Sequence, residues 1–203
     1  MRQGFYGMTE TDHPLFNGRS ARGRLLRTAA GRFRAQGYAA TTVRDIAADL
    51  GIQSGSLFHH FRSKDDILFA VMQTVVEAMN ADLTEALATA PDTRARVRAL
   101  IAVELAYLHG PASDATAVLF HEWRALPPER QAFLMDGRDR YFGAWHRVLA
   151  QAHAEGLTAL RPDILRQFLH GALAWTSFWY DPAGAMSREA LIDQALTLAL
   201  DGS

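Results

Sequence analysis

Residues 42–64 read TVRDIAADLGIQSGSLFHHFRSK and begin with the signals of a short helix. Thr42 is a favourable helix N-cap, because its hydroxyl group can accept a hydrogen bond from the first turn. The apolar residues that follow share the spacing of one helix face: Val43, Ile46, Ala47 and Leu50. Gly51 is expected to end this helix, since glycine adopts left-handed backbone freely. The next residue, Ile52, is expected to plug a tight turn.

A second short helix is expected directly after this turn. Ser54 is predicted to cap it, and Leu57 and Phe61 are predicted to lie on its buried side. Two short helices around a glycine-containing turn form a helix-turn-helix, whose second helix commonly enters the major groove of DNA. The pattern therefore predicts a DNA-binding element.

The same residues resemble the DNA-binding domain of TetR-type transcriptional repressors. The matching positions run through both helices and the turn: Thr42, Arg44, Ile46, Ala47, Gly51, Gly55, Leu57, Phe58, His60, Phe61 and Lys64. Upstream, residues 25–38 (LLRTAAGRFRAQGY) match the first helix of that domain, so the resemblance covers about residues 22–68.

The resemblance implies DNA contacts at individual positions of this chain. Three residues are expected to approach base edges: Ser54, Gly55 and Ser56. Arg44 is expected to reach a base or a phosphate. Four residues are expected to face phosphates: Thr42, His59, His60 and Lys64. Phe58 stands where the family usually has tyrosine, so a hydroxyl contact is lost there.

The distribution of charge agrees with a DNA-facing head. The 203 residues have a formal net charge of −1, but residues 1–64 hold ten Lys and Arg against four Asp and Glu, a net of +6. Residues 65–203 hold eleven against eighteen, a net of −7. A basic head on an acidic body suits a module that faces phosphates, joined to a part that stays off DNA.

Several classes of function and site are excluded or disfavoured by composition. The chain has no cysteine, so disulfides, thiolate metal sites and thiol redox switches are excluded. No apolar run reaches the length of a membrane span, and no signal peptide is visible, so a cytoplasmic protein without a membrane partner is expected. Catalytic and metal-binding motifs are also missing, which predicts no catalytic residue, no bound metal and no cofactor.

The remaining pattern predicts an all-α chain of about nine helices, with no strand and no internal repeat. Besides the two short helices, the expected ranges are 20–36, 63–88, 92–108, 113–123, 127–154, 163–180 and 188–200. We expect residues 1–18 to form a flexible arm, in which Met1 or Met8 could start translation. Residues 19–66 are then the DNA-binding domain, and residues 67–203 are a domain for ligand binding and dimerisation.

The body is rich in aromatic residues, which at helical spacing can form either an ordinary core or the wall of an apolar pocket. Residues 120–149 resemble the ligand-binding domain of a TetR branch whose members respond to acyl-CoA thioesters, including steroid-ring catabolites. The ligand-binding residues implied are Phe120, Trp123, Arg124, Arg138, Tyr141, Trp145, Trp175 and Trp179. Arg124, Arg138 or Arg140 could hold an anionic tail, because guanidinium binds phosphate in a bidentate manner.

The last two helices carry more apolar surface than one core-facing stripe needs, which favours an oligomer interface. The resemblance implies a four-helix bundle between two copies. The predicted interface residues are Phe168, Ala172, Leu191, Ile192, Ala195 and Leu196. Together these patterns predict a homodimeric repressor that binds a palindromic operator and is released by a hydrophobic effector. The alternatives are an effector-binding helical protein without operator binding and, less favoured, a helical enzyme.

Overall fold

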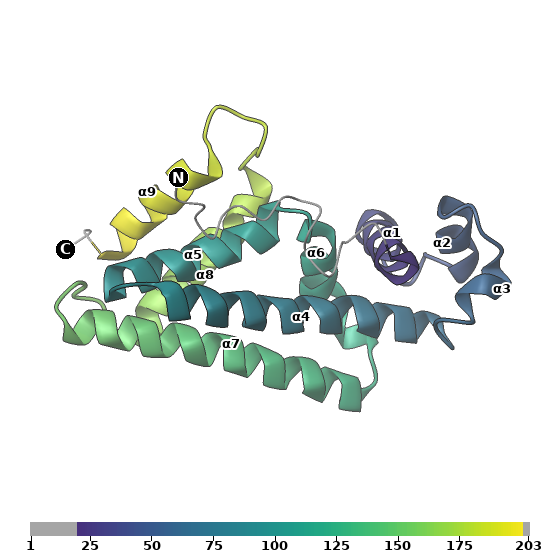
Figure 1. The fold of residues 1–203 in the computed structure, drawn as a ribbon, viewed down its shortest axis with the longest axis horizontal. Helices are drawn as coiled ribbons and strands as arrows, with labels where there is room; N and C mark the ends of the chain where they lie inside the picture. Colours follow the sequence, from purple (N-terminus) through teal and green to yellow (C-terminus); the bar gives the residue numbers. More distant parts are fainter. Residues whose placement is uncertain (1–19, 201–203) are drawn as a thin grey trace. The chain divides into compact units, whose positions relative to one another are not determined.

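The computed structural model describes residues 20–200, and most of them are helical (Figure 1). The elements in chain order are α1 (Ala21–Gln36), α2 (Val43–Asp49), α3 (Ser54–Leu57), α4 (Lys64–Thr89), α5 (Thr93–His109), α6 (Ser113–Glu122), η1 (Trp123–Ala125), α7 (Pro128–Ala154), α8 (Pro162–Trp175), η2 (Thr176–Phe178) and α9 (Arg188–Leu200). The described part contains no strand, so the prediction of an all-α fold with about nine helices is confirmed. The predicted arm of residues 1–18 lies outside the described residues.

The chain divides into two compact units. The head comprises Met1–Ala78 and Pro111–Gly137, and the body comprises Met79–Gly110 and Arg138–Ser203. This division does not follow sequence order, because α6 and the first part of α7 belong to the head. Helices α4 and α7 are each continuous and contribute residues to both units.

The head is built around α1. Ser20 caps this helix by accepting a 2.9 Å hydrogen bond from the backbone N–H of Gly23. The residues of its inner face are buried: Leu25, Leu26, Ala29, Ala30 and Phe33. Helix α1 packs on α2 and α6, and the backbone N–H of Tyr38 donates to the Glu122 carboxylate at 3.0 Å. The helix-turn-helix therefore rests on a helical support that is distant from it in sequence.

The body is built around α5, which packs on α8 and α9. Asp92 caps α5 by accepting a 2.7 Å hydrogen bond from the backbone N–H of Ala95. The buried positions of α8 follow one face: Leu165, Leu169 and Leu173. On α9 the buried residues are Leu191, Ile192, Leu196, Ala199 and Leu200.

Four local predictions were wrong. Ile52 does not plug the turn but has 42% of its surface exposed, because Gly51 with a φ of 65° directs the chain away from the core. Ser54 is the first residue of α3 rather than its N-cap, which is Gln53 without a side-chain hydrogen bond. Phe61 is buried, but it lies beyond the end of α3. Helix α8 ends at Trp175, and the chain continues as η2 instead of reaching Tyr180 as one helix.

Candidate DNA-binding surface and effector site

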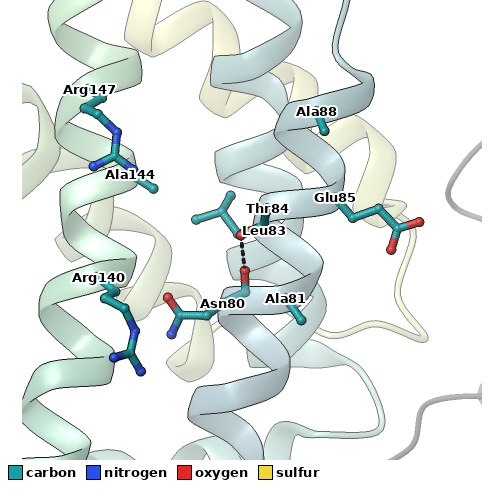
Figure 2. A pocket seen from close by; sticks show the side chains of 9 residues that line it. All are labelled: Asn80, Ala81, Leu83, Thr84, Glu85, Ala88, Arg140, Ala144 and Arg147. Carbon is teal, nitrogen blue, oxygen red and sulfur yellow. Dashed lines mark hydrogen bonds between the residues drawn. The ribbon is translucent and has the colours of Figure 1, made fainter.

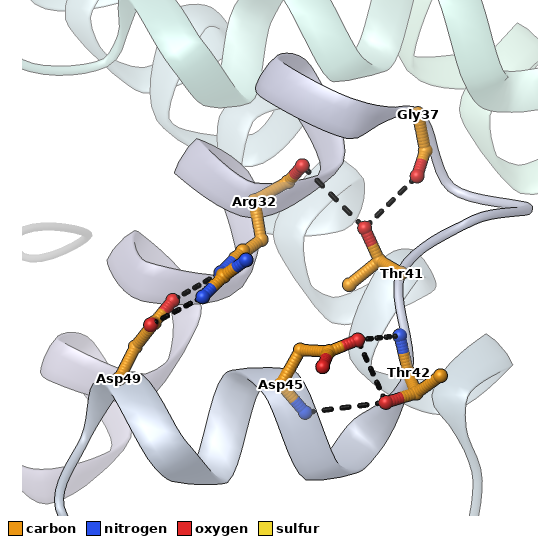
Figure 3. Close-up of polar contacts among 6 residues, drawn as sticks. All are labelled: Arg32, Gly37, Thr41, Thr42, Asp45 and Asp49. Carbon is orange, nitrogen blue, oxygen red and sulfur yellow. Dashed lines mark hydrogen bonds and ion pairs between the residues drawn. The ribbon is translucent and has the colours of Figure 1, made fainter.

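The start of α2 is fixed by a reciprocal pair of hydrogen bonds (Figure 3). The Thr42 hydroxyl accepts from the backbone N–H of Asp45 at 3.2 Å, and the Asp45 carboxylate accepts from the backbone N–H of Thr42 at 2.8 Å. This is a capping box, which satisfies two helix-end donors at once. The side-chain and backbone hydrogen bonds from Thr42 also lower the pKa of the Asp45 carboxyl.

A second set of contacts ties α2 to α1. The Arg32 guanidinium forms a two-pronged ion pair with the Asp49 carboxylate, with one of its bonds at 2.6 Å (Figure 3). The hydrogen bond from Arg32 lowers the pKa of Asp49. The buried Thr41 hydroxyl donates to the backbone carbonyl of Gly37 at 2.9 Å. These contacts hold the turn between the two helices in one conformation.

Lys64 joins the same turn to the beginning of α4. Its ammonium group donates to the carbonyl oxygens of Tyr38 and Thr41, both at 2.8 Å. It also lies 4.2 Å from the centre of the Tyr38 ring, a cation–π contact. Two of its three N–H groups are therefore used inside the head. The sequence predicted Lys64 as a phosphate contact and missed this structural role, because the carbonyl partners lie more than twenty residues upstream.

The other predicted DNA-contacting residues form the outer surface of the helix-turn-helix. Those classed as exposed are Thr42, Arg44, Gly55, Ser56, Phe58, His59 and His60. Ser54 is half-buried. Phe58 has 54% of its surface exposed, so its ring is accessible on this surface. Arg62, which the sequence reasoning did not single out, is also exposed and adds a cation near His60.

The predicted effector residues fall into both units, and only two of them come together in the body. Phe120, Trp123 and Arg124 belong to the head, where the Arg124 guanidinium lies 5.1 Å from the Trp123 ring centre. In the body, Tyr141 and Trp145 are buried on α7 with ring centres 6.3 Å apart.

Three predicted effector residues lie elsewhere in the body. Trp175 and Trp179 are exposed, so they do not line the space around Tyr141. Helix α8 turns its leucines inward and Trp175 outward, and Trp179 follows beyond the end of η2, so the prediction that both tryptophans contact the effector stays a prediction. Arg138 is exposed and pairs with its neighbour Asp139 at 2.8 Å.

A buried polar cluster surrounds Tyr141. Its hydroxyl donates to Glu104 Oε2 at 2.7 Å, and Glu104 is only 1% exposed. Burial first, and then the Glu104 carboxylate, raise the pKa of the Tyr141 hydroxyl well above its ordinary value. His170 Nδ1 lies 3.0 Å from Glu104 Oε1, but the geometry of this contact is not that of a hydrogen bond. Glu104 Oε1 and His170 Nδ1 are thus buried as partners in this contact, and the buried Trp145 side chain lies close enough to Tyr141 for its hydrogen bonding to lower the Tyr141 pKa in part.

A groove of about 690 Å³ lies between the body parts of α4 and α7 (Figure 2). Its α7 wall is formed by Arg140, Ala144 and Arg147. Its α4 wall consists of Asn80, Ala81, Leu83, Thr84, Glu85 and Ala88. Arg140 is the one lining residue that the sequence had suggested as an anion contact. A groove between two helices could not be located from residue spacing on one of them.

The residues of the predicted dimer face differ in their burial within the single chain. Leu191, Ile192 and Leu196 are buried within the single chain because α9 packs them onto α5, and Ala195 is half-buried. Phe168, at 65% exposed, and Ala172 do lie on the outer face of α8. Further large apolar residues share this exposure: Ile164, Trp175, Phe178, Trp179 and Leu198. The exposed apolar residues of α8 recur at the spacing of one helix side, so they form a continuous apolar stripe.

Within residues 20–200, no group of three or more His, Asp or Glu side chains could hold a metal ion. Every helix in the range is too short or too polar to cross a lipid bilayer.

Comparison with known proteins covers both parts of the chain. Residues 25–71 match the family described as bacterial regulatory proteins, tetR family, and residues 90–203 match the tetracyclin repressor-like C-terminal domain. The HTH-type transcriptional repressor KstR2 of Rhodococcus jostii is 33% identical over 184 residues, which is 88% of each protein.

Solved structures give the same picture. The ketosteroid transcriptional regulator KstR2 of Mycobacterium tuberculosis is 28% identical, with a TM-score of 0.82 over 91% of this chain and 95% of that one. A crystal structure described as superantigen pfit is 44% identical, with a TM-score of 0.78 over 90% of each chain. Since family matches cover both the helix-turn-helix and more than half of the sequence beyond it, this chain belongs to the TetR family of bacterial regulatory proteins.

Proposed function

We propose that the protein is a transcriptional repressor that binds operator DNA through the outer surface of α2 and α3. The observation that carries this proposal is that polar side chains are exposed on this surface while hydrogen bonds and an ion pair fix the helix beneath them. Arg44, Ser56 and His60 are exposed there, while the capping box and the Arg32–Asp49 pair fix the helices that bear them. Side chains on a fixed support can read base edges without first being ordered, which lowers the entropic cost of binding.

Operator binding is tested by fluorescence anisotropy with the DNA upstream of the protein's own gene. Arg44→Ala should weaken binding by about 5- to 150-fold if Arg44 contacts a base, or reduce the salt slope by about 0.9 if it contacts a phosphate. Arg161→Ala, which removes the same charge from the body, is the matched control. If wild-type protein binds this DNA no better than unrelated DNA, the alternative of an effector-binding protein without this operator is favoured.

The repressor is proposed to act as a homodimer on a near-palindromic site. The apolar stripe of α8 is too large to remain exposed on a soluble regulator, and a two-fold axis would cover it with the same stripe of a second copy. Two heads related by this axis would enter successive major grooves about 34 Å apart.

The proposed effector is a hydrophobic molecule bound in the body, with acyl-CoA thioesters as the first class to test. The relatives include KstR2, a ketosteroid transcriptional regulator, and the resemblance of residues 120–149 points to acyl-CoA. In the body, Glu104, Tyr141 and Trp145 form a buried polar cluster among apolar residues, and a carbonyl or hydroxyl group on an apolar ligand would find hydrogen-bond partners there. Effector binding would then release the operator in the cytoplasm, where the DNA lies.

A further inference from the structure

We propose that the segment around α3 reads A·T base pairs of the operator, with the Gln53 amide on an adenine and the Phe58 ring on the methyl group of a thymine. This inference rests on the proposed operator binding and adds the class of base that this surface selects. The DNA contacts predicted from the sequence do not include Gln53. They include Phe58 only as a position that lacks the usual tyrosine hydroxyl.

The segment offers no charged side chain for reading guanine or cytosine. Residues 51–58 read GIQSGSLF and contain no Lys, Arg, Asp or Glu. Lys or Arg is the usual partner of the two guanine acceptors, O6 and N7, and Asp or Glu can accept from the cytosine amino group. The exposed side chains of the segment are instead an amide, a hydroxyl group and two apolar groups, at Gln53, Ser56, Ile52 and Phe58. This set of side chains favours adenine and thymine over guanine and cytosine.

Gln53 is exposed on the outer surface of the head, directly before α3. Its side chain makes no cap hydrogen bond, while its backbone carbonyl accepts a 2.9 Å hydrogen bond from the N–H of Ser56, which fixes the position of the residue. A glutamine amide carries an acceptor and a donor side by side, and adenine offers the complementary N6 donor and N7 acceptor in the major groove. On guanine the amide oxygen would face an acceptor instead, so the pairing selects adenine.

Phe58 provides an apolar surface at the other end of α3. It is 54% exposed, and its backbone N–H donates to the carbonyl of Gly55 at 3.2 Å, next to the buried Leu57 that anchors the helix. The side chains of Ser54 and Ser56 are small, so α3 can approach base edges closely. Thymine presents a methyl group in the major groove, and phenylalanine is among the residues that contact it. A ring without a hydroxyl group has no hydrogen bond to donate to a phosphate, but it gains free energy by covering this methyl group.

The test selects binding sites from a library of randomised DNA duplexes with the full-length protein. The variants are Gln53→Ala and Phe58→Ala, and the matched control is Gln36→Ala, which removes an exposed glutamine from α1 in the same head. All three residues are exposed, so the variants should fold like the wild-type protein, which thermal unfolding checks. Wild-type and control protein should enrich the same two-fold symmetric motif. Gln53→Ala should lose a preference for adenine in each half-site, and Phe58→Ala should lose a preference for thymine.

Base analogues in the selected site then test single atoms by fluorescence anisotropy. Replacing the adenine of one half-site by 7-deazaadenine removes the N7 acceptor, which should weaken wild-type binding about 2- to 10-fold and leave Gln53→Ala unaffected. Replacing the thymine by uracil removes the methyl group, which should weaken wild-type binding about fourfold and leave Phe58→Ala unaffected.

Several results would contradict these contacts. An unchanged motif for Gln53→Ala, or a guanine or cytosine at the position whose preference it loses, would overturn the adenine contact. Equal sensitivity of wild-type and Phe58→Ala protein to uracil would overturn the thymine contact. If wild-type protein enriched no motif, the proposed operator binding would itself fail, whereas a wild-type motif that survived both substitutions would overturn this inference alone.

Discussion

At the scale of single residues, a substitution at Lys64 distinguishes a structural role of this side chain from a DNA contact. Replacing it by methionine removes two hydrogen bonds from a charged donor, which should destabilise the head by about 1–3 kcal/mol. Urea denaturation followed by circular dichroism measures this change. His60→Ala, on the exposed surface, should leave stability within about 0.5 kcal/mol. If Lys64→Met left stability unchanged but reduced the salt dependence of DNA binding, Lys64 would instead be a phosphate contact.

Asp66 gives a pH dependence whose sign can be worked out. Its carboxylate pairs with Arg130, and this contact lowers the pKa of Asp66 below its ordinary value of 3.8. A lowered folded-state pKa contributes stability above pH 3.8, and this contribution is lost as pH falls through the folded-state pKa. Asp66→Asn should therefore cost about 1 kcal/mol at pH 7, because both side chains of the pair are about a quarter exposed and solvent screens them in part.

The check for Asp66 is a series of urea midpoints from pH 7 down to about pH 2. The difference between wild-type and Asp66→Asn protein should shrink below pH 3.8 and stay constant above about pH 5. A difference that grew on acidification would contradict the assignment of the shift to Arg130. Because Asp66 lies in the first turn of α4 and Arg130 in the first turn of α7, this pair also fastens two long helices within the head.

At the scale of elements, α8 can be tested as an interface without disturbing the core. Phe168→Glu places a charge on the exposed apolar stripe, so the single chain should still fold, while a dimer built on this stripe should dissociate. Sedimentation velocity should show a shift toward monomer. Ala132→Glu, which adds the same charge at an exposed position of α7 in the head, is the control. A dimer that survives Phe168→Glu together with Leu198→Glu would place the interface on another surface.

Leu196 and Ile192, which the sequence favoured for this test, are unsuitable. Both are buried within the chain, so glutamate at either position would unfold α9 whether or not a dimer exists. The difference shows what an apolar pattern can and cannot predict. Spacing identified which residues of α8 and α9 avoid water, but it could not say which of them α5 buries and which are left for a partner.

The helix ends were more predictable than the contacts between helices. Thr42 caps α2 as predicted, and α4 and α5 begin within one residue of the predicted starts, since helix ends depend on neighbours within one turn. The carbonyl partners of Lys64 and the burial of Glu104 were missed, because both depend on residues far away along the chain. For the same reason the exposed surface of the helix-turn-helix, which is local in sequence, was easier to predict than the packing of side chains in the body.

At the scale of the whole molecule, the proposed function requires that effector binding weakens operator binding and that operator binding weakens effector binding. An effector can release DNA only by as much as it prefers the DNA-incompetent state. With a typical coupling of about 1–3 kcal/mol, operator affinity should fall about 5- to 150-fold at saturating effector, and operator DNA should weaken effector binding by the same factor. Helices α4 and α7 are the candidates for this coupling, because each continues from the head into the body.

Trp145 is the position at which this coupling is best tested. It is fully buried, so Trp145→Ala would leave a cavity that costs about 3–5 kcal/mol and would confuse loss of response with loss of folding. Trp145→Phe keeps most of the apolar volume and removes the buried Nε1 donor beside Tyr141. The variant should bind operator within a few-fold of wild type and need more octanoyl-coenzyme A for release, as measured by anisotropy titrations of the DNA complex. An unchanged titration curve would remove Trp145 from the effector site, and a matching loss of operator affinity would show that the substitution acts on the fold.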